Sequence, residues 1–214
     1  MTVAGTHAHE GVEPTRPPRG PYAGKRAFDL GVVAVLSVPA AVLGGLAALA
    51  VKLEDGGPVL FRQERIGLGG RPFLILKLRT MTHGEVNPLF PDPTRITRTG
   101  RVLRRLSLDE LPQLVNVLRG DMSIVGPRPT LAYQVARYTP EQAGRLAVRP
   151  GLTGLAQVNG RNNRTWAGRI VLDLTYVQNQ SLRQDLLLLL QSVRVVLAAD
   201  PSGHPVDDPL ARPD

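Results

Sequence analysis

The sequence predicts an α+β fold that is mostly helical and is attached to a membrane by one apolar segment. Three observations support this class. Residues 30–51 contain no charged side chain, and residues 58–81 alternate apolar and polar residues on both sides of a glycine-rich turn. Several later segments repeat apolar residues at helical spacing. The 214 residues suffice for one domain with a sizeable core.

Both ends of the chain lack a hydrophobic period. Residues 1–24 and 199–214 are rich in proline, glycine and small or polar residues, which is typical of disordered tails. Between them we expect a membrane helix at 25–52. A single domain at 53–198 is expected to lie in the cytosol or at the membrane surface.

The positive charge of the chain, +8 in net, resides mostly in arginine, because lysine occurs only at Lys25, Lys52 and Lys77. Guanidinium groups suit phosphate and carboxylate, so nucleic acid, membrane headgroups or a phosphorylated substrate are the expected partners. Only 4% of the residues are aromatic, which disfavours nucleic acid. The chain has no cysteine and four histidines that lie mostly toward its ends. Catalysis, if present, therefore rests on carboxylates, arginines and a hard metal ion.

The uncharged segment 30–51 is long enough to cross a bilayer core of about 30 Å at about 1.5 Å per residue. A straight transmembrane helix, a re-entrant hairpin and a buried core helix all fit its composition. Basic residues stand on both sides, with Lys25 before and Lys52 after, so a straight span would export one basic flank. A break at Ser37 and Pro39 would keep both flanks in the cytoplasm. We therefore favour the re-entrant helix-break-helix hairpin.

Residues 58–81 predict a small β-hairpin. The motif "GLGG" marks its turn, since the spacing of a phosphate-binding P-loop is absent. Lys77 and Arg79 alternate with leucines near the end of the second strand. We expect both cations to share one face and to meet the same anion.

The rest of the chain is expected to be mixed and mostly helical. A polar loop at 82–95 precedes two short helices, which flank the acidic pair Asp109 and Glu110. Residues 149–163 are expected to form a loop. Helical patterning returns at 165–180 and at 182–198, and the leucine run within the second segment is too short to span a membrane. That segment suits an amphipathic interfacial helix or a core helix.

The acidic pair allows a structural and a functional interpretation. Ser107 and Glu110 have the spacing of a helix capping box. Pro112 counts against its simplest form, because proline fits only the first helical turn. A helix that begins at Asp109 or later would place both carboxylates at its N-terminus, where the helix dipole stabilises them.

The functional interpretation uses the neighbouring arginines. Of two adjacent carboxylates, one can hold a divalent cation while the other attacks an electrophile. Arg104 and Arg105 come just before the pair, and Arg128 follows it in the rigid sequence Pro-Arg-Pro. These arginines can serve as ion-pair partners or can neutralise a pyrophosphate.

Four long motifs follow one another along residues 24–198. They are "KRAFDL" before the apolar segment, "GPVLFRQERIGLGGRPFLILKLRTM", "TRTGRVLRRLSLDELPQLVNVLRGDMSIVGPRP" and "RPGLTGLAQVNGRN". In these motifs the chain resembles the bacterial sugar transferases, the monotopic polyprenyl-phosphate phosphoglycosyl transferases. It is similar to their minimal catalytic form, without the N-terminal transmembrane bundle of the larger members. Motifs of this length in the same order are highly specific.

The resemblance implies a two-step, ping-pong transfer at the cytoplasmic face of the bacterial inner membrane. Asp109 would attack the β-phosphate of a UDP-sugar, releasing UMP, and undecaprenyl phosphate would then accept the phosphosugar. Glu110 would hold Mg²⁺, with Mn²⁺ as an alternative. Residues implied or suggested to bind substrate phosphate are Arg104, Arg128, Lys77 and Arg79.

The resemblance also implies a re-entrant hairpin with a Ser-Pro kink, although Val38 stands between Ser37 and Pro39 here. Membrane lipids are expected partners, nucleic acid is not, and a homodimer is an open alternative. The sequence does not identify the sugar or the glycan pathway. Residues that select the sugar are expected in the C-terminal third, around "NGRNN" at 159–163. A membrane-surface scaffold, in which the acidic pair is only a cap, and a basic nucleic-acid-binding domain are the rival hypotheses.

Overall fold

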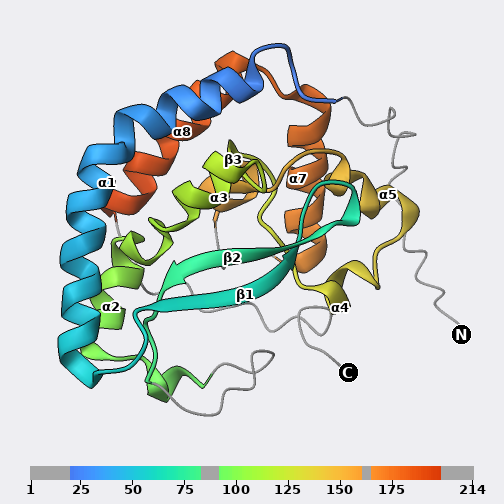
Figure 1. Cartoon of the computed structure of the whole chain (residues 1–214). Coiled ribbons are helices and arrows are strands. Elements are labelled where there is room, and N and C mark those ends of the chain that lie inside the picture. The colour runs from blue at the N-terminus through green and yellow to red at the C-terminus, as the bar shows by residue number, and fades with distance from the viewer. Residues whose placement is uncertain (1–19, 83–91, 161–164, 199–214) are drawn as a thin grey trace, which may run out of the picture.

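The computed structural model describes residues 20–82, 92–160 and 165–198, so nearly all of the two predicted tails lies outside it. Figure 1 shows a long N-terminal helix along one side, a β-hairpin across the middle and two long helices from the C-terminal third. The helix is α1 (Lys25–Asp55), the strands are β1 (Leu60–Ile66) and β2 (Pro72–Leu78), and the later helices are α7 (Trp166–Asn179) and α8 (Leu182–Ala198). The predicted class, mostly helical with small sheets, is confirmed.

α1 is helical from end to end, with Pro39 inside it, where the sequence predicted a helix-break-helix. The Ser37 hydroxyl donates to the Ala34 carbonyl at 2.7 Å, within the turn that precedes the proline. Figure 1 shows that the helix bends around the molecule instead of running straight. A proline that removes one helical hydrogen bond permits such a bend without ending the helix. The predicted break is therefore a bend in a continuous helix.

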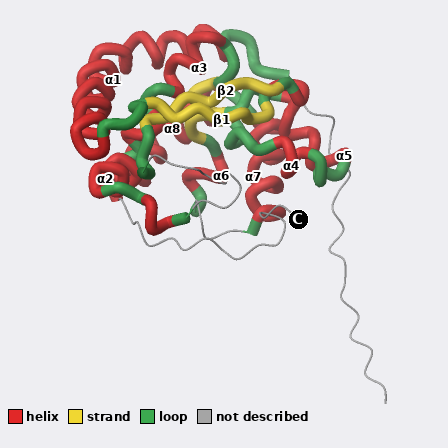
Figure 2. The backbone as a smooth tube through the Cα atoms, turned by 60° about the horizontal axis from the view of Figure 1, so that its bottom comes forward, coloured by secondary structure: helices red, strands yellow, loops and turns green. Residues whose placement is uncertain are grey.

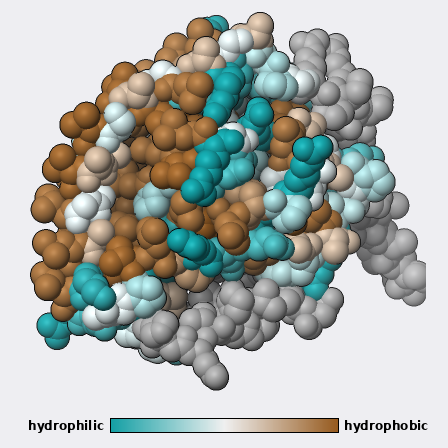
Figure 3. Space-filling model, viewed as in Figure 1, coloured by the Kyte–Doolittle hydropathy of each residue, from teal (hydrophilic) through white to brown (hydrophobic). Residues whose placement is uncertain are grey.

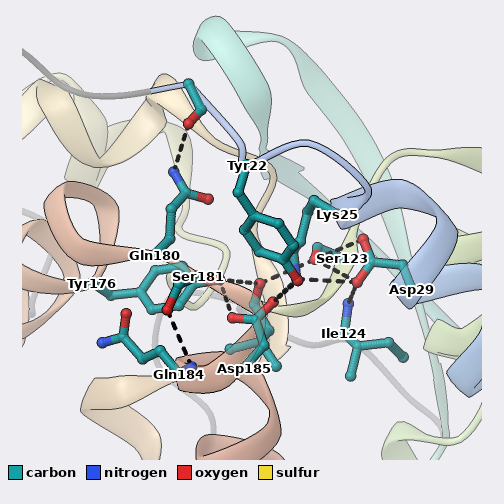
Figure 4. Close-up of polar contacts among 12 residues, drawn as sticks. Tyr22, Lys25, Asp29, Ser123, Ile124, Tyr176, Gln180, Ser181, Gln184 and Asp185 are labelled. Atoms are coloured by element: carbon teal, nitrogen blue, oxygen red, sulfur yellow. Dashed lines mark hydrogen bonds and ion pairs between the residues drawn. The ribbon is translucent and has the colours of Figure 1, made fainter.

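A buried polar network fixes the N-terminal end of α1 (Figure 4). Lys25 Nζ lies 2.6 Å from Asp185 Oδ2 on α8 and 3.1 Å from Asp29 Oδ1. Tyr22 and Tyr176 each donate a hydroxyl hydrogen bond to Asp185, at 2.9 and 2.8 Å. Burial and the Asp185 carboxylate raise the pKa of both tyrosines, so both stay donors. The network joins the start of α1 to α7 and α8.

The C-terminal end of α1 packs on the same body. Ala47 and Val51 form a small cluster with Leu78 and Leu103. Between its two ends the helix exposes large apolar side chains, which Figure 3 shows as a brown band along its side. Those more than half exposed are Val35, Val38, Val42, Leu46, Leu49 and Leu53. α1 is the helix in the described ranges that is long and apolar enough to cross a membrane.

The predicted β-hairpin is confirmed, with β1 and β2 paired antiparallel throughout. Its turn contains Gly69 and Gly70, which have φ angles of 63° and 79° that favour glycine. Behind β2 lies α3 (Gln113–Arg119), whose buried Asn116 accepts a hydrogen bond from Leu76 N at 3.0 Å and donates one to Leu74 O at 2.8 Å. One side chain thus fixes the helix that follows the acidic pair against the strand that carries Lys77.

The two short helices predicted around the acidic pair are confirmed as α2 (Arg98–Arg105) and α3, and the two C-terminal helices as α7 and α8. The expected loop at 149–163 is wrong in part. It contains β4 (Gly151–Thr153), which pairs in parallel with β3 (Ser123–Val125), and α6 (Leu155–Val158). A Cβ on Gly151 would lie 2.1 Å from the Gly126 nitrogen, so this close backbone approach requires glycine. The remaining short helices are α4 (Ala132–Val135) and α5 (Pro140–Ala143).

The main core lies between α1, α3, α7 and the two strand pairs. Its buried side chains include Ile75, Val117, Met122, Ile124 and Tyr176. Figure 2 shows the hairpin lying across the helices from the α2 side to the α7 side. Residues far apart in the sequence therefore meet beneath the hairpin.

Candidate active site

The acidic pair lies in a single 3-10 turn, Leu108–Glu110, that precedes α3. Pro112 occupies the N-cap of α3, with φ −60°, so the helix begins after the pair, as the proline predicted. Ser107 makes no capping bond with its side chain, which rules out the capping box. With φ 56° it is the one non-glycine residue of positive φ among residues 20–82, 92–160 and 165–198. Such costly backbone conformations cluster at functional sites.

A cavity of about 800 Å³ lies beside this turn. Its size suits a nucleotide-sized ligand. All six polar residues predicted for substrate, metal or catalysis line it, although they come from four separate segments of the chain. They are Lys77, Arg79, Arg104, Asp109, Glu110 and Arg128.

Glu110 is held by two cations. Lys77 Nζ lies 2.8 Å and Arg128 Nη2 lies 3.0 Å from the same oxygen, Glu110 Oε1. Burial alone would raise the pKa of this carboxyl, but the charges and hydrogen bonds of Arg128 and Lys77 outweigh it and hold the pKa far below its usual range. Glu110 is therefore ionised at any physiological pH.

Asp109 has a different environment although it is the adjacent residue. It is 8% exposed, and burial raises its pKa, while the charges of Lys77 and Arg104 oppose the rise without cancelling it. Its carboxylate is thus less stabilised by its neighbours than that of Glu110, and so more available to a reaction partner. Two carboxylates whose environments push their pKa values apart are typical of sites in which each has its own role.

The other two predicted cations are arranged differently. Arg104 donates from Nε to the Thr80 hydroxyl at 2.8 Å. Arg79 forms an ion pair with Asp55 at the end of α1. Lys77 and Arg79 therefore pair with different carboxylates of the protein, although both line the cavity; that they meet one substrate anion stays a prediction. Arg79 links the end of α1 to the hairpin.

Seven residues of the C-terminal third also line the cavity and were not predicted: Arg145, Ala156, Gln157, Trp166, Arg169, Ile170 and Asp173. Arg145 donates from Nη2 to the Arg128 carbonyl at 2.9 Å and forms a buried ion pair with Asp173. The sequence holds one signal for them, since Asp173 falls on the apolar face of α7 between Ile170 and Tyr176, all three buried. Of the predicted sugar-selecting stretch, residues 161–163 lie outside the described residues.

The expected Mg²⁺ ligand can be tested against the donors present. No group of three or more metal-binding side chains occurs in the described part of the chain. Mg²⁺ is commonly held by one or two carboxylates together with substrate phosphates. Asp109 and Glu110 fit a site of that kind, which a diphosphate would complete.

This fold and this site fit an enzyme that acts on a phosphorylated substrate at an apolar surface. A buried carboxylate with a raised pKa, a carboxylate fixed by two cations and further arginines line one cavity, and α1 exposes apolar side chains. The family model of the bacterial sugar transferases matches residues 21–199. The chain belongs to that family.

Individual relatives support the assignment. The chain is 51% identical to the UDP-glucose:undecaprenyl-phosphate glucose-1-phosphate transferase of Caulobacter vibrioides, over 82% of this chain and 70% of that protein. It is 47% identical to an uncharacterized sugar transferase of Bacillus subtilis, EpsL, over 82% of this chain and 88% of that one. It is 41% identical to the exopolysaccharide production protein ExoY of Rhizobium meliloti, over 80% and 84% of the two chains.

Proposed function

We propose that this protein transfers a phosphosugar from a UDP-sugar to undecaprenyl phosphate, and so starts the assembly of a lipid-linked glycan. The names of two relatives contain undecaprenyl phosphate and glucose-1-phosphate transfer. The single observation that carries the proposal is the unequal pair of carboxylates. Asp109 is buried with a raised pKa, while Glu110 beside it is fixed by Lys77 and Arg128.

In the first step, an Asp109 carboxylate oxygen attacks the β-phosphorus of the UDP-sugar. The new carboxylate–phosphorus bond forms as the bond from the β-phosphorus to the bridging oxygen breaks. That oxygen leaves with the α-phosphate as UMP, and the phosphosugar stays on Asp109 as an acyl phosphate. Arg104 and Arg128 at the cavity wall would offset the charge of the diphosphate, so that an anionic nucleophile can approach it.

In the second step, a phosphate oxygen of undecaprenyl phosphate attacks the phosphorus of the acyl phosphate. The bond to Asp109 breaks, the free carboxylate returns, and the product is a lipid-linked diphosphosugar. Glu110 would hold Mg²⁺ against the phosphates, and the ion would neutralise charge that develops on them. Fixed in place by Lys77 and Arg128, Glu110 needs no rearrangement to do so.

The two ends of α1 support a re-entrant membrane topology. Lys25 is bound to Asp185 of α8, and Val51 packs against Leu103 of α2, so both ends meet the same domain. A helix that crossed the bilayer would place its ends on opposite sides. We infer that α1 enters and leaves the membrane from the cytoplasmic face, with its bend in the lipid. The reactive carboxylate then lies at the interface, where a lipid phosphate and a soluble nucleotide sugar can both reach it.

The test uses the full chain in nanodiscs with Mg²⁺, undecaprenyl phosphate and a panel of UDP-sugars, beginning with UDP-glucose. UMP release together with a lipid-linked diphosphosugar supports the proposal. If no UDP-sugar is consumed while the protein stays folded, the chain is a membrane-surface scaffold and the proposal fails.

A further inference from the structure

The loop that presents Arg128 to the acidic turn is anchored by a side chain from the C-terminal third. Arg128 stands between Pro127 and Pro129, which have no backbone N–H to donate, so the carbonyl groups of this loop carry much of its attachment. The Pro127 carbonyl accepts from Gly151 N at 2.8 Å. The Arg128 carbonyl accepts from Arg145 Nη2 at 2.9 Å. This second bond fixes the backbone of the residue whose guanidinium reaches the acidic turn.

Arg145 is itself held by several partners and is only 4% exposed. Its guanidinium forms a buried ion pair with Asp173 of α7 and donates from Nη1 to the Tyr138 hydroxyl at 2.5 Å. The ring centres of Tyr138 and Trp166 lie 5.7 and 5.8 Å from it, within the range of a cation–π contact. A guanidinium held in this way is a rigid anchor, so the position of α7 fixes that of the Arg128 backbone.

The position of that backbone matters because the Arg128 side chain is half exposed. Arg128 Nη2 donates to Glu110 Oε1 at 3.0 Å, and the place that a long side chain reaches depends on where its backbone lies. A misplacement of about 1 Å can lower the rate of a reaction about a hundredfold. Arg145 is nearly buried and already bonded to protein groups, so we expect it to act on Arg128 and not to bind substrate.

We propose that Arg145 is a positioning residue of the reaction, which holds the Arg128 backbone where its guanidinium can meet both Glu110 and the diphosphate of the donor. Asp173 anchors Arg145 for that task. This inference rests on the proposed function, since it concerns a cation that would bind the phosphates of the donor. A purely structural role of the Arg145–Asp173 pair is the alternative. A positioning role acts through Arg128 and is lost when Arg128 is absent, whereas a structural role is not.

The first measurement compares Arg145→Lys with wild type, using the full chain in nanodiscs. Lysine keeps the charge beside Asp173, but its single ammonium cannot reproduce the planar fork that also reaches the Arg128 carbonyl. We expect kcat/KM for UMP release to fall about tenfold or more, with a small change in melting temperature because the ion pair remains. Asp173→Asn, which keeps the shape of the side chain, should lower kcat/KM as well.

The matched control is Arg149→Lys. The half-buried Arg149 also donates to a backbone carbonyl, that of Gly120 at 2.7 Å, but does not line the cavity. It should behave as wild type.

The deciding measurement repeats these substitutions in Arg128→Met. If Arg145 acts through Arg128, Arg145→Lys should lower kcat/KM less than about twofold in that background, because the effects of residues that act together do not add. A residue that only supports the fold would show no such coupling, so an equal loss in both backgrounds would overturn the proposal. If Arg145→Lys does not fold, the same comparison with Asp173→Asn decides.

Binding of inorganic pyrophosphate, measured by calorimetry, separates a failure of this proposal from a failure of the proposed function, because it needs no turnover. Arg145→Lys should weaken pyrophosphate binding about tenfold when Arg128 is present and less than about twofold in Arg128→Met. If no UDP-sugar were consumed, the proposed function would fail while this comparison would still decide the role of Arg145. Unchanged pyrophosphate affinity in Arg145→Lys would overturn that role even if UMP is released.

Discussion

At the scale of single residues, two adjacent carboxylates differ because their neighbours differ. Glu110 accepts from Lys77 and Arg128, and so its charge is stabilised. Asp109 is buried without such direct partners in the described hydrogen bonds, and so its charge is less stabilised. On the proposed mechanism, this difference suits Asp109 to the role of nucleophile and Glu110 to that of a fixed anion.

Replacing Lys77 by methionine tests whether activity requires Glu110 to be held in place by this cation. Glu110 would keep only Arg128, so its pKa should rise and its position should loosen. We expect kcat/KM for UMP release to fall by about a hundredfold or more, the usual loss when one preorganised electrostatic partner is removed. The control is Arg119→Met, which removes an exposed cation of α3 that does not line the cavity. Equal activity in the two variants would contradict the role given to Lys77.

The raised pKa of Asp109 also predicts how kcat/KM depends on pH. A raised pKa means that this carboxyl takes up a proton at a higher pH than an ordinary aspartate, and the protonated form cannot attack. The acidic limb of kcat/KM should therefore lie above about pH 4, the ordinary range for aspartate, while Glu110 stays ionised throughout. Lys77→Met should shift the limb further up, because the Lys77 charge lowers the Asp109 pKa. Rates that stay flat down to about pH 4 would contradict the assignment.

The sequence predicted the six polar residues of the acidic turn and its surroundings because their signals lie within short stretches. These signals are two adjacent acids, an arginine between two prolines and cations that alternate with leucines along a strand. It did not predict that Arg79 would pair with Asp55, since this contact depends on how α1 ends. The cavity-lining residues of the C-terminal third were missed for the same reason. Gln157 and Asp173 reach the cavity only through the packing of α6 and α7, which no local pattern reports.

At the scale of elements, α1 is fixed by a different kind of contact at each end. Its C-terminal end packs through apolar side chains, whereas its N-terminal end depends on Lys25, which meets the two buried carboxylates of Asp29 and Asp185. The length and apolar composition of residues 30–51 predicted the helix itself. The bend in place of a break could not be predicted, because it depends on how both ends are held.

Lys25→Met should destabilise the fold strongly. It leaves two buried carboxylates without their cation, and breaking a buried ion pair typically costs about 3–5 kcal/mol. Thermal unfolding in detergent measures the loss. Lys52→Met is the control, since its exposed ammonium only donates to the Gly56 carbonyl, and it should change stability much less. If the two variants unfold alike, the network does not hold α1.

At the scale of the whole molecule, the hairpin, the acidic turn, α6 and α7 line one cavity, and α1 exposes a bent apolar surface. Exposed apolar side chains continue from α1 onto the neighbouring helices. They include Val102 and Leu106 at α2, Val115 and Leu118 on α3, and Leu186 and Leu190 on α8. A surface of this extent fits the proposed contact with lipid.

The re-entrant topology can be tested directly because the chain has no cysteine. Single cysteines at Ala23 and at Leu53, just before and near the end of α1, should both react with an impermeant maleimide from the cytoplasmic side of inverted vesicles. Both should be protected in intact spheroplasts. Labelling of the two positions from opposite sides would show a straight span.

The central claim is a covalent phosphosugar on Asp109. Intact-protein mass spectrometry tests it most directly, after incubation of the chain with UDP-sugars and Mg²⁺ but without undecaprenyl phosphate. We predict a mass increase of one phosphosugar together with UMP release, and its disappearance when undecaprenyl phosphate is added. Asp109→Asn should show no increase, whereas the control Asp92→Asn, at an exposed position outside the cavity, should behave as wild type. A mass increase that survives in Asp109→Asn would contradict the account.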